Sequence, residues 1–107
     1  MPTYPPSAVA VIFISQRTLA DEAGYAEAAD AMVSLAQLQP GYLGIDSARG
    51  EDRVGITVSY WADEAAAKAW RDHPEHKTIR DAGRDRWYSR YDLHVASVTR
   101  SYDWAKD

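Results

Sequence analysis

Residues 8–16 read AVAVIFISQ, and this stretch decides the fold. Both of its alternating sets of side chains are apolar: Val9, Val11 and Phe13 on one side, Ala10, Ile12 and Ile14 on the other. A strand that is apolar on both sides is typical of a strand buried on both faces. The rest of the protein must therefore cover two faces of this strand.

The residues that follow predict an amphipathic helix over 22–39. Its apolar residues recur at helical spacing and form one stripe: Tyr25, Ala28, Met32, Leu35 and Ala36. Residues 18–21 (TLAD) are similar to a capping box with Asp in place of Glu, and Gly24 weakens the first turn. The helix ends before Pro40–Gly41, because a residue that precedes proline is disfavoured in the α conformation.

Three further strands are predicted. The runs 43–49 and 54–61, separated by turn residues 50–52, indicate a β-hairpin. The last strand is expected over 90–102, after a linker at 84–89. Its apolar residues do not alternate strictly: Leu93, Val95, Val98 and Tyr102. We therefore expect a bulge in this strand or burial on both of its faces.

The second helical region is interrupted by a proline. Residues 64–72 (EAAAKAWRD) are strong helix formers, and Asp63 is a suitable N-cap. Pro74 disrupts a continuous helix but suits the first turn of a new one. We therefore expect a break at His73–Pro74 and a renewed helix over 75–82, which Gly83 ends.

This order, β-α-β-β-α-β, predicts an α+β fold of the ferredoxin-like type with a four-stranded antiparallel sheet. Both helices would cover one face of the sheet, which leaves the other face as a large apolar patch. We therefore predict a homodimer that buries the uncovered face. The domain would span 8–102, between an extended N-terminal arm at 1–7 and a C-terminal tail at 103–107.

The composition excludes several classes of protein. A chain of 107 residues without cysteine is one domain with no disulfide, thiolate zinc site, iron–sulfur cluster or cysteine nucleophile. Acidic residues outnumber basic ones by 16 to 12, which argues against nucleic-acid binding. No apolar run approaches the roughly 20 residues that span a membrane. The first residues lack the features of a signal peptide, so we expect a cytoplasmic protein.

Four strings, together with the element order, carry a resemblance to a known family: QPGYLG (39–44), SYW (59–61), AWRDHPEH (69–76) and GRDRWY (83–88). From Ala8 to Tyr102 the chain resembles the antibiotic biosynthesis monooxygenase (ABM) superfamily, whose members form dimeric α+β barrels. The resemblance implies an apolar cavity between the helices and the sheet. In such proteins this cavity holds a polycyclic aromatic substrate, or haem, and oxygenation needs no flavin or separate metal.

The resemblance also implies site residues. Characterised members use a tryptophan on the second helix, which Trp70 matches. They also use an asparagine on the first strand, which would fall near Ser15 or Gln16, but this chain contains no asparagine. In haem degraders a histidine follows the tryptophan by ten residues, and here that position is Arg80. His76 lies six residues after Trp70, and a shift at Pro74 could bring it inward.

We therefore expect Trp70, His76 and Gln16 to be the catalytic residues. Trp70 would shape the pocket, although core packing is an equally ordinary role for a helix tryptophan. His76 would move a proton, because the pKa of histidine suits acid–base work near neutral pH. Gln16 would orient a carbonyl or phenolate. The expected substrate-binding residues are Ser15, Tyr60, Arg80 and Trp87.

No metal site is expected. His73 and His76 are three residues apart, but no third ligand follows at the spacing of a catalytic zinc site. The resemblance implies a cofactor-independent monooxygenase of a small hydrophobic or aromatic molecule, and this is the function that we expect. The alternatives are a haem-binding or haem-degrading protein, and a non-catalytic dimeric module that binds a small molecule.

Overall fold

The predicted element order is confirmed. The structure is a computed structural model that describes residues 3–106, so residues 1, 2 and 107 of the predicted arm and tail lie outside the described residues. The elements follow in the expected order: β1 (Val9–Arg17), α1 (Glu22–Gln37), β2 (Tyr42–Arg49), β3 (Val54–Trp61), α2 (Glu64–Arg71), α3 (Pro74–Ala82), a π-helical turn η1 (Gly83–Trp87) and β4 (Tyr88–Ser97). This is the predicted ferredoxin-like α+β arrangement.

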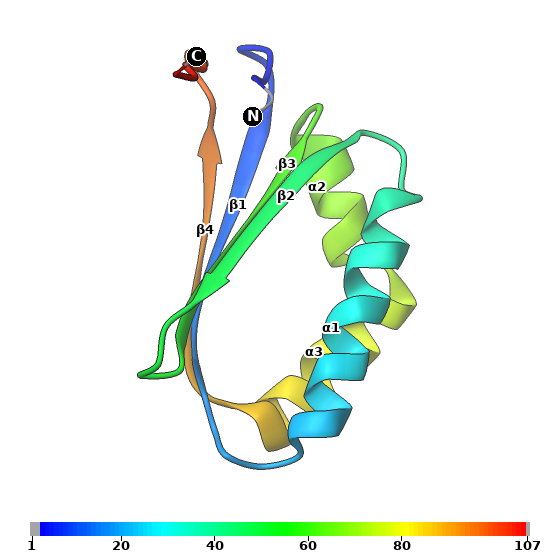
Figure 1. Cartoon of the computed structure of the whole chain (residues 1–107). Helices are drawn as coiled ribbons and strands as arrows, with labels where there is room; N and C mark the ends of the chain where they lie inside the picture. Colours follow the sequence, from blue (N-terminus) through cyan, green and yellow to red (C-terminus); the bar gives the residue numbers. More distant parts are fainter. Residues whose placement is uncertain (1–2, 107) are drawn as a thin grey trace.

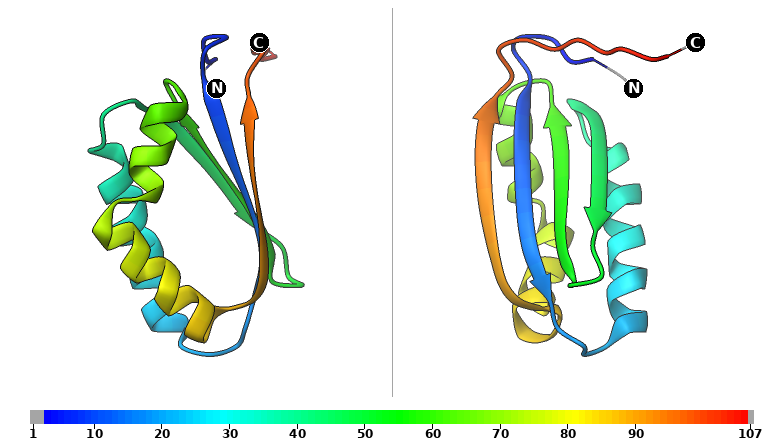
Figure 2. Two further views of the ribbon diagram at one scale, coloured as in Figure 1. Left: turned by 180° about the vertical axis from the view of Figure 1, so that it is seen from behind. Right: turned by 60° about the vertical axis from the view of Figure 1, so that its left-hand side comes forward.

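The four strands form one antiparallel sheet in the order β2-β3-β1-β4. The helices all lie on one face of this sheet, and both chain ends lie at the same end of the molecule (Figures 1 and 2). Strand β1 pairs with a neighbour on each side, so it is an inner strand. One of its apolar sets faces the helices, and the other, Ala10, Ile12 and Ile14, lies on the face that no helix covers.

The pairing register places each side chain on one face of the sheet. Four rows face the helices, from the top of Figure 1 to the bottom: Val9 with Trp61, Val11 with Ser59 and Val95, Phe13 with Thr57 and Leu93, and Ser15 with Gly55 and Tyr91. The alternate residues form the opposite face, which we call the outer face. Its apolar members are Ala10, Ile12, Ile14, Val54, Ile56, Val58 and Tyr60.

The packed core occupies one end of the space between sheet and helices. Its buried members are Val9, Ala36, Trp61, Ala67 and Trp70. Trp61 is fully buried, and its indole N–H donates a hydrogen bond of 3.0 Å to Ser59 Oγ. The large aromatic residues thus fill the region where β3 meets α2, and their polar atom has a partner.

The start of α1 differs from the predicted capping box. Asp21 itself is the N-cap, in a left-handed conformation with φ of 52°, and its carboxylate accepts a hydrogen bond from Gly24 N. A Cβ at Gly24 would overlap the Asp21 carboxylate, so this glycine admits the cap. Thr18 instead bonds its hydroxyl to the carbonyl of Arg86. The helix also ends at Gln37, two residues earlier than expected.

The predicted break between the last two helices is confirmed. Helix α2 ends at Arg71 and α3 begins at Pro74. His73 caps α3, with its Nδ1 accepting a hydrogen bond from Glu75 N at 3.2 Å. Pro74 lies in the first turn, where a backbone N–H has no acceptor within the helix, so the missing N–H of proline costs no hydrogen bond.

The prediction for the last segment was partly wrong. Helix α3 ends at Ala82 with Gly83 as its C-cap, as predicted, but Gly83 is right-handed α and the chain continues directly into η1, where a linker was expected. Trp87 at the end of η1 is buried, and its indole donates to Asp21 at 3.1 Å. This long-range contact fixes the turn. Strand β4 then runs from Tyr88 to Ser97, and residues 98–106 have no regular secondary structure.

The irregularity expected in this region lies at the start of β4, where its register against β1 shifts between Gln16 and Arg17. At the opposite end of the sheet, the N-terminal segment lies against the outer face. Tyr4 stacks on Tyr60 at 4.0 Å between ring centroids, and its N–H donates to Ser101 Oγ at 3.1 Å. Within residues 3–106, no helix has the length and apolar character needed to cross a membrane.

Candidate functional site

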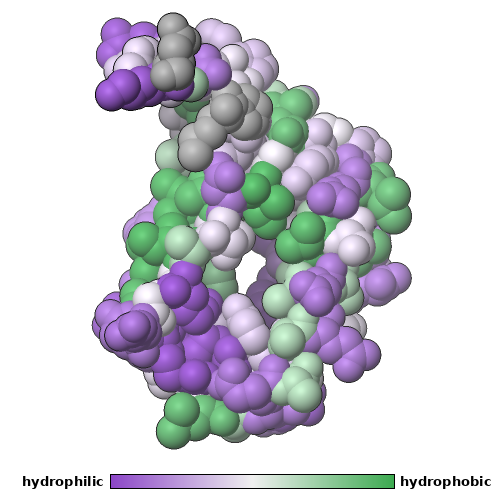
Figure 3. Space-filling view, viewed as in Figure 1, coloured by the Kyte–Doolittle hydropathy of each residue, from purple (hydrophilic) through white to green (hydrophobic). Residues whose placement is uncertain are grey.

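The helices do not close over the whole sheet. Leu93 pairs with Phe13 and Val95 pairs with Val11, so both side chains belong to the helix-facing side. Nevertheless, 48% of Leu93 and 56% of Val95 remain exposed. The space-filling view shows an opening between the sheet and the helices (Figure 3). The interior therefore contains a hollow that β1 and β4 border with apolar side chains.

A stack of three rings lies at the core end of the interior. Trp70 is nearly parallel to Trp61, with centroids 5.9 Å apart, and to His76, with centroids 4.6 Å apart. Burial decreases from Trp61 to His76, which is only half-buried. His76 is thus the member of the stack that a ligand can reach. The break at Pro74 produces this contact, because it turns the start of α3 back onto the end of α2.

His76 has a defined tautomer. Its Nδ1 lies 2.9 Å from the carbonyl oxygen of Trp70. A carbonyl only accepts hydrogen bonds, so Nδ1 carries the proton and Nε2 is the basic nitrogen. Burial lowers the pKa of His76, the Trp70 hydrogen bond opposes this, and the positive charge of Arg80 adds to the lowering. His76 is therefore neutral at pH 7 and able to accept a proton.

Arg80 lies one helical turn after His76, on the same side of α3. Its side chain is half-buried, and its Nε is buried without a hydrogen-bond partner among residues 3–106. A proton acceptor and a cation thus stand next to each other on α3. This pair suits a reaction in which a substrate loses a proton and becomes an anion.

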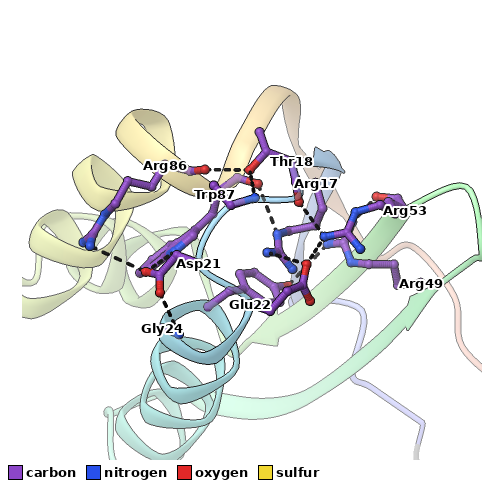
Figure 4. A network of polar contacts seen from close by, with 11 residues as sticks. Arg17, Thr18, Asp21, Glu22, Gly24, Arg49, Arg53, Arg86 and Trp87 are labelled. Atoms are coloured by element: carbon purple, nitrogen blue, oxygen red, sulfur yellow. Dashed lines mark hydrogen bonds and ion pairs between the residues drawn. The ribbon is translucent and has the colours of Figure 1, made fainter.

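A polar cluster lies at the opposite end of the interior, where β1, α1 and the β2–β3 turn meet (Figure 4). Arg17 is 5% exposed, and its guanidinium lies 3.5 Å from the ring centroid of Tyr25. Glu22 forms ion pairs with both Arg17 and Arg53. Cation–π and ionic contacts together hold the buried arginine in place.

Arg49 reaches into this cluster from the end of β2. Its Nη2 donates to Ser15 Oγ at 2.9 Å and lies 3.4 Å from the hydroxyl of Tyr25. Its Nη1 donates to the carbonyls of Ser15 and Arg53, at 3.2 and 2.6 Å. To reach Ser15 on β1, the guanidinium crosses Gly55 on β3, where any Cβ would overlap it. Gly55 is therefore required for this contact.

Aromatic rings lie beside the polar cluster, at the border of the hollow. Phe13 lies 5.4 Å from Tyr88 and 5.1 Å from Tyr91, measured between ring centroids. Burial raises the pKa of the Tyr88 phenol, and the neighbouring Tyr25 adds to the rise. Tyr88 therefore remains a neutral phenol throughout the ordinary pH range.

The structure brings together three of the predicted site residues and separates the others. Trp70, His76 and Arg80 lie together on α2 and α3. Ser15 faces the helices at the far end and binds Arg49. Trp87 is buried and bonded to Asp21, so it supports the fold at the start of α1.

Gln16 and Tyr60 lie on the outer face, across the sheet from His76. Gln16 donates to the carbonyl of Asp52 at 2.9 Å, and Tyr60 stacks on Tyr4. Strand alternation is the cause: Ser15 and Gln16 are neighbours in sequence, so only one of them can face the helices. Within this protomer, neither Gln16 nor Tyr60 reaches the interior.

Sequence reasoning missed Arg49, Tyr25 and Arg17. Tyr25 was assigned to the apolar stripe of the first helix, and the two arginines stand at strand ends, where charged residues are ordinary. One signal was present. Gly55 interrupts an otherwise β-rich strand, and a glycine inside a strand often marks the close approach of another group.

The two histidines of the second helical region do not form a metal site. The Nδ1 atoms of His73 and His76 are both engaged with backbone groups. In the part of the chain that the structure describes, no group of three or more His, Cys, Asp or Glu side chains is placed to hold a metal ion.

A second hollow lies on the surface, between the end of α1 and α2. It has a volume of about 350 Å³, and its lining includes Gly41, Ala66, Ala69 and Trp70. Gly41 has a positive φ of 84°, and a Cβ there would collide with Ala66. His76 does not line this groove, and the carboxylate that does, Asp63, is engaged as the N-cap of α2, where it accepts a hydrogen bond from Ala66 N.

Comparison with known proteins agrees with this fold. The family described as "antibiotic biosynthesis monooxygenase" matches residues 9–82. The chain belongs to the antibiotic biosynthesis monooxygenase family. It is also 47% identical over 98 residues to the uncharacterized protein YqjZ of Bacillus subtilis, a match that covers 92% of this chain and 85% of YqjZ.

Solved structures share the fold at low sequence identity. SnoaB of Streptomyces nogalater, described as a cofactor-independent oxygenase, superposes with a TM-score of 0.68 at 17% identity, over 82% of this chain and 91% of its own. Rv0793 of Mycobacterium tuberculosis gives a TM-score of 0.75 at 17% identity, over 94% and 100% of the two chains.

Proposed function

We propose that this protein is a cofactor-independent monooxygenase of a small aromatic, electron-rich substrate. One observation carries the proposal: a half-buried His76, whose pKa burial lowers, stacks on the ring of Trp70 and lies one helical turn from Arg80, on the helices that face the partly uncovered sheet. Apolar walls with a few convergent polar groups are typical of small-molecule sites. Family membership gives independent support to oxygenase chemistry.

The proposed reaction begins with a proton transfer. A phenolic substrate lies in the hollow, and Nε2 of His76 accepts its hydroxyl proton. The positive charge of Arg80 stabilises the resulting phenolate, since both groups lie on one face of α3. Trp70 is a positioning residue in this scheme, because it holds the imidazole plane and its backbone carbonyl fixes the tautomer.

The phenolate then reacts with dioxygen. For 1-naphthol, one oxygen atom forms a bond to the para carbon and the other leaves as water, giving 1,4-naphthoquinone. The substrate loses four electrons in total and dioxygen gains four, so no further reductant is needed. SnoaB, which shares the fold, is described as cofactor-independent. Arg80 stands where haem degraders have a histidine, so we propose the cofactor-free reaction rather than haem chemistry.

The test is consumption of 1-naphthol by the purified protein under isotope-labelled dioxygen. One labelled oxygen should appear in the quinone. His76→Gln should reduce the rate about 100-fold, the usual contribution of a general base. His94→Gln, which changes a histidine on the outer face, should leave the rate unchanged. Oxidation at equal rates in wild type and His76→Gln would refute the role of His76, and binding without oxidation would indicate a non-catalytic module.

We further propose that the protein acts as a homodimer that pairs two outer faces. The outer face carries a central apolar stripe, and Val54 and Ile56 remain 38% and 48% exposed on it. Polar residues of β2 and β4 flank the stripe: Asp46, Arg90, Asp92 and His94. An apolar centre with a polar rim is the usual anatomy of a protein–protein interface.

A further inference from the structure

The polar cluster at the far end of the interior has an excess of positive charge. Three arginines meet there, Arg17, Arg49 and Arg53, whereas Glu22 is the one carboxylate that forms ion pairs with them. Arg17 and Arg53 share that carboxylate. Within residues 3–106, no carboxylate lies within ion-pair distance of Arg49. The guanidinium of Arg49 is therefore held by neutral oxygens only.

Because the partners of Arg49 are neutral hydroxyls and carbonyls, hydrogen-bond donors in the cluster remain available to a ligand. Ser15 Oγ accepts a hydrogen bond from Arg49, and the Tyr25 hydroxyl lies close enough to accept a weaker one. A hydroxyl oxygen that accepts a hydrogen bond from Arg49 still has its own proton, which the Ser15 and Tyr25 hydroxyls can donate to a ligand. Arg49, Tyr25 and Ser15 thus form a set of donors with no internal anion. Such a set favours an anionic partner over a neutral one.

Arg49 is both positioned and accessible. Two backbone carbonyls hold Nη1, and the absent side chain of Gly55 lets the guanidinium lie over the sheet. The side chain as a whole remains exposed, whereas Ser15 beneath it is buried. Arg49 is therefore the group that meets a ligand, and Ser15 is a residue that positions it.

The cluster lies one row below the aromatic border of the hollow. Ser15 and Phe13 are two residues apart on the same side of β1, a rise of roughly 7 Å. A ring held against Phe13, Leu93 and Tyr91 would therefore place a short acidic substituent beside Arg49. Planar pairing of a guanidinium with a carboxylate gives two parallel hydrogen bonds.

We propose that Arg49 binds the carboxylate of an aromatic acid whose rings occupy the hollow between sheet and helices. This inference rests on the proposed function in one respect, namely that the hollow holds the substrate. It adds the substrate class: the natural ligand is an aromatic molecule with an acidic group at the end remote from His76.

Calorimetric titration with 2-naphthoate and 2-naphthamide tests the inference. The two probes have nearly the same size and shape, but only the first is an anion. Wild type should bind the naphthoate at least 10-fold more tightly, and added salt should reduce that preference. Arg49→Gln should abolish it without changing the affinity for the amide. Tyr25→Phe, which preserves the ring over Arg17, should reduce it by a few fold.

Arg90→Gln is the matched control, because it removes the same charge from the outer face. It should preserve the preference for the naphthoate. Equal affinity of wild type for both probes, or equal loss of preference in Arg49→Gln and Arg90→Gln, would overturn the inference. Neither probe needs to be oxidised, so the anion site is tested separately from the monooxygenase activity. A thermal melt of each variant confirms that it is folded.

Discussion

At the scale of single residues, Gly55 connects the fold to the proposed anion site. A Cβ at this position would overlap the Arg49 guanidinium, which is a movable side-chain end. Because that end can move aside, we predict that Gly55→Ala costs only about 1 kcal/mol of unfolding free energy, the usual net value of the lost Arg49–Ser15 hydrogen bond. Urea denaturation measures this cost. In an Arg49→Ala background the same change should cost nothing, because the overlap is gone; an unchanged cost would mean that Gly55 matters for another reason.

His76 predicts a particular pH dependence. Burial keeps the pKa of His76 below its ordinary value in the folded protein, whereas in the unfolded chain the pKa is ordinary. The unfolded state therefore binds a proton first as the pH falls, so stability should decrease from about pH 6.5 downward. His76→Gln should show a shallower decrease of Tm between pH 7 and 5 than wild type. If the Tm of His76→Gln decreased with pH as steeply as the Tm of wild type and of His94→Gln, the lowered pKa of a buried His76 would be contradicted.

At the scale of elements, the two helix caps offer a comparison. Asp63 caps α2 with one bond of 2.8 Å to Ala66 N. Asp21 caps α1, receives the Trp87 indole and pairs with Arg86, all from a left-handed backbone that alanine adopts poorly. We predict a loss of about 1 kcal/mol for Asp63→Ala and about 2–3 kcal/mol for Asp21→Ala, measured by urea denaturation. Equal losses would mean that the Trp87 contact adds no stability.

The elements also show what local sequence predicts. The apolar run at 8–16, the turn at 50–52 and Pro74 are signals within a few residues of the structure they set. The strand, the hairpin turn and the helix break that they predict were confirmed. The π-helical turn was not predicted, because the bond from Trp87 to Asp21 joins positions 66 residues apart. The Arg49 contact was missed for the same reason. Only the folded sheet places β2, Gly55 and Ser15 in one row.

At the scale of the whole molecule, the outer face predicts the state of assembly. We expect a dimer of about 24 kDa by light scattering, twice the chain mass of 11.9 kDa. Ile56→Asp places a charge in the apolar stripe and should give a monomer, since an unpaired buried charge is costly. Leu38→Asp, on an exposed residue beyond the end of α1, should remain dimeric. A wild-type monomer, or a dimer of Ile56→Asp, would contradict pairing through this face.

We place the site of chemistry in the hollow between sheet and helices, with His76 as its proton acceptor. A crystal structure with bound 1-naphthol tests it most directly. We expect ligand density in the hollow, with the naphthol hydroxyl within hydrogen-bond distance of His76 Nε2 and the rings against Phe13 and Leu93. Density confined to the surface groove at Gly41 and Ala66, or to the outer face, would contradict it.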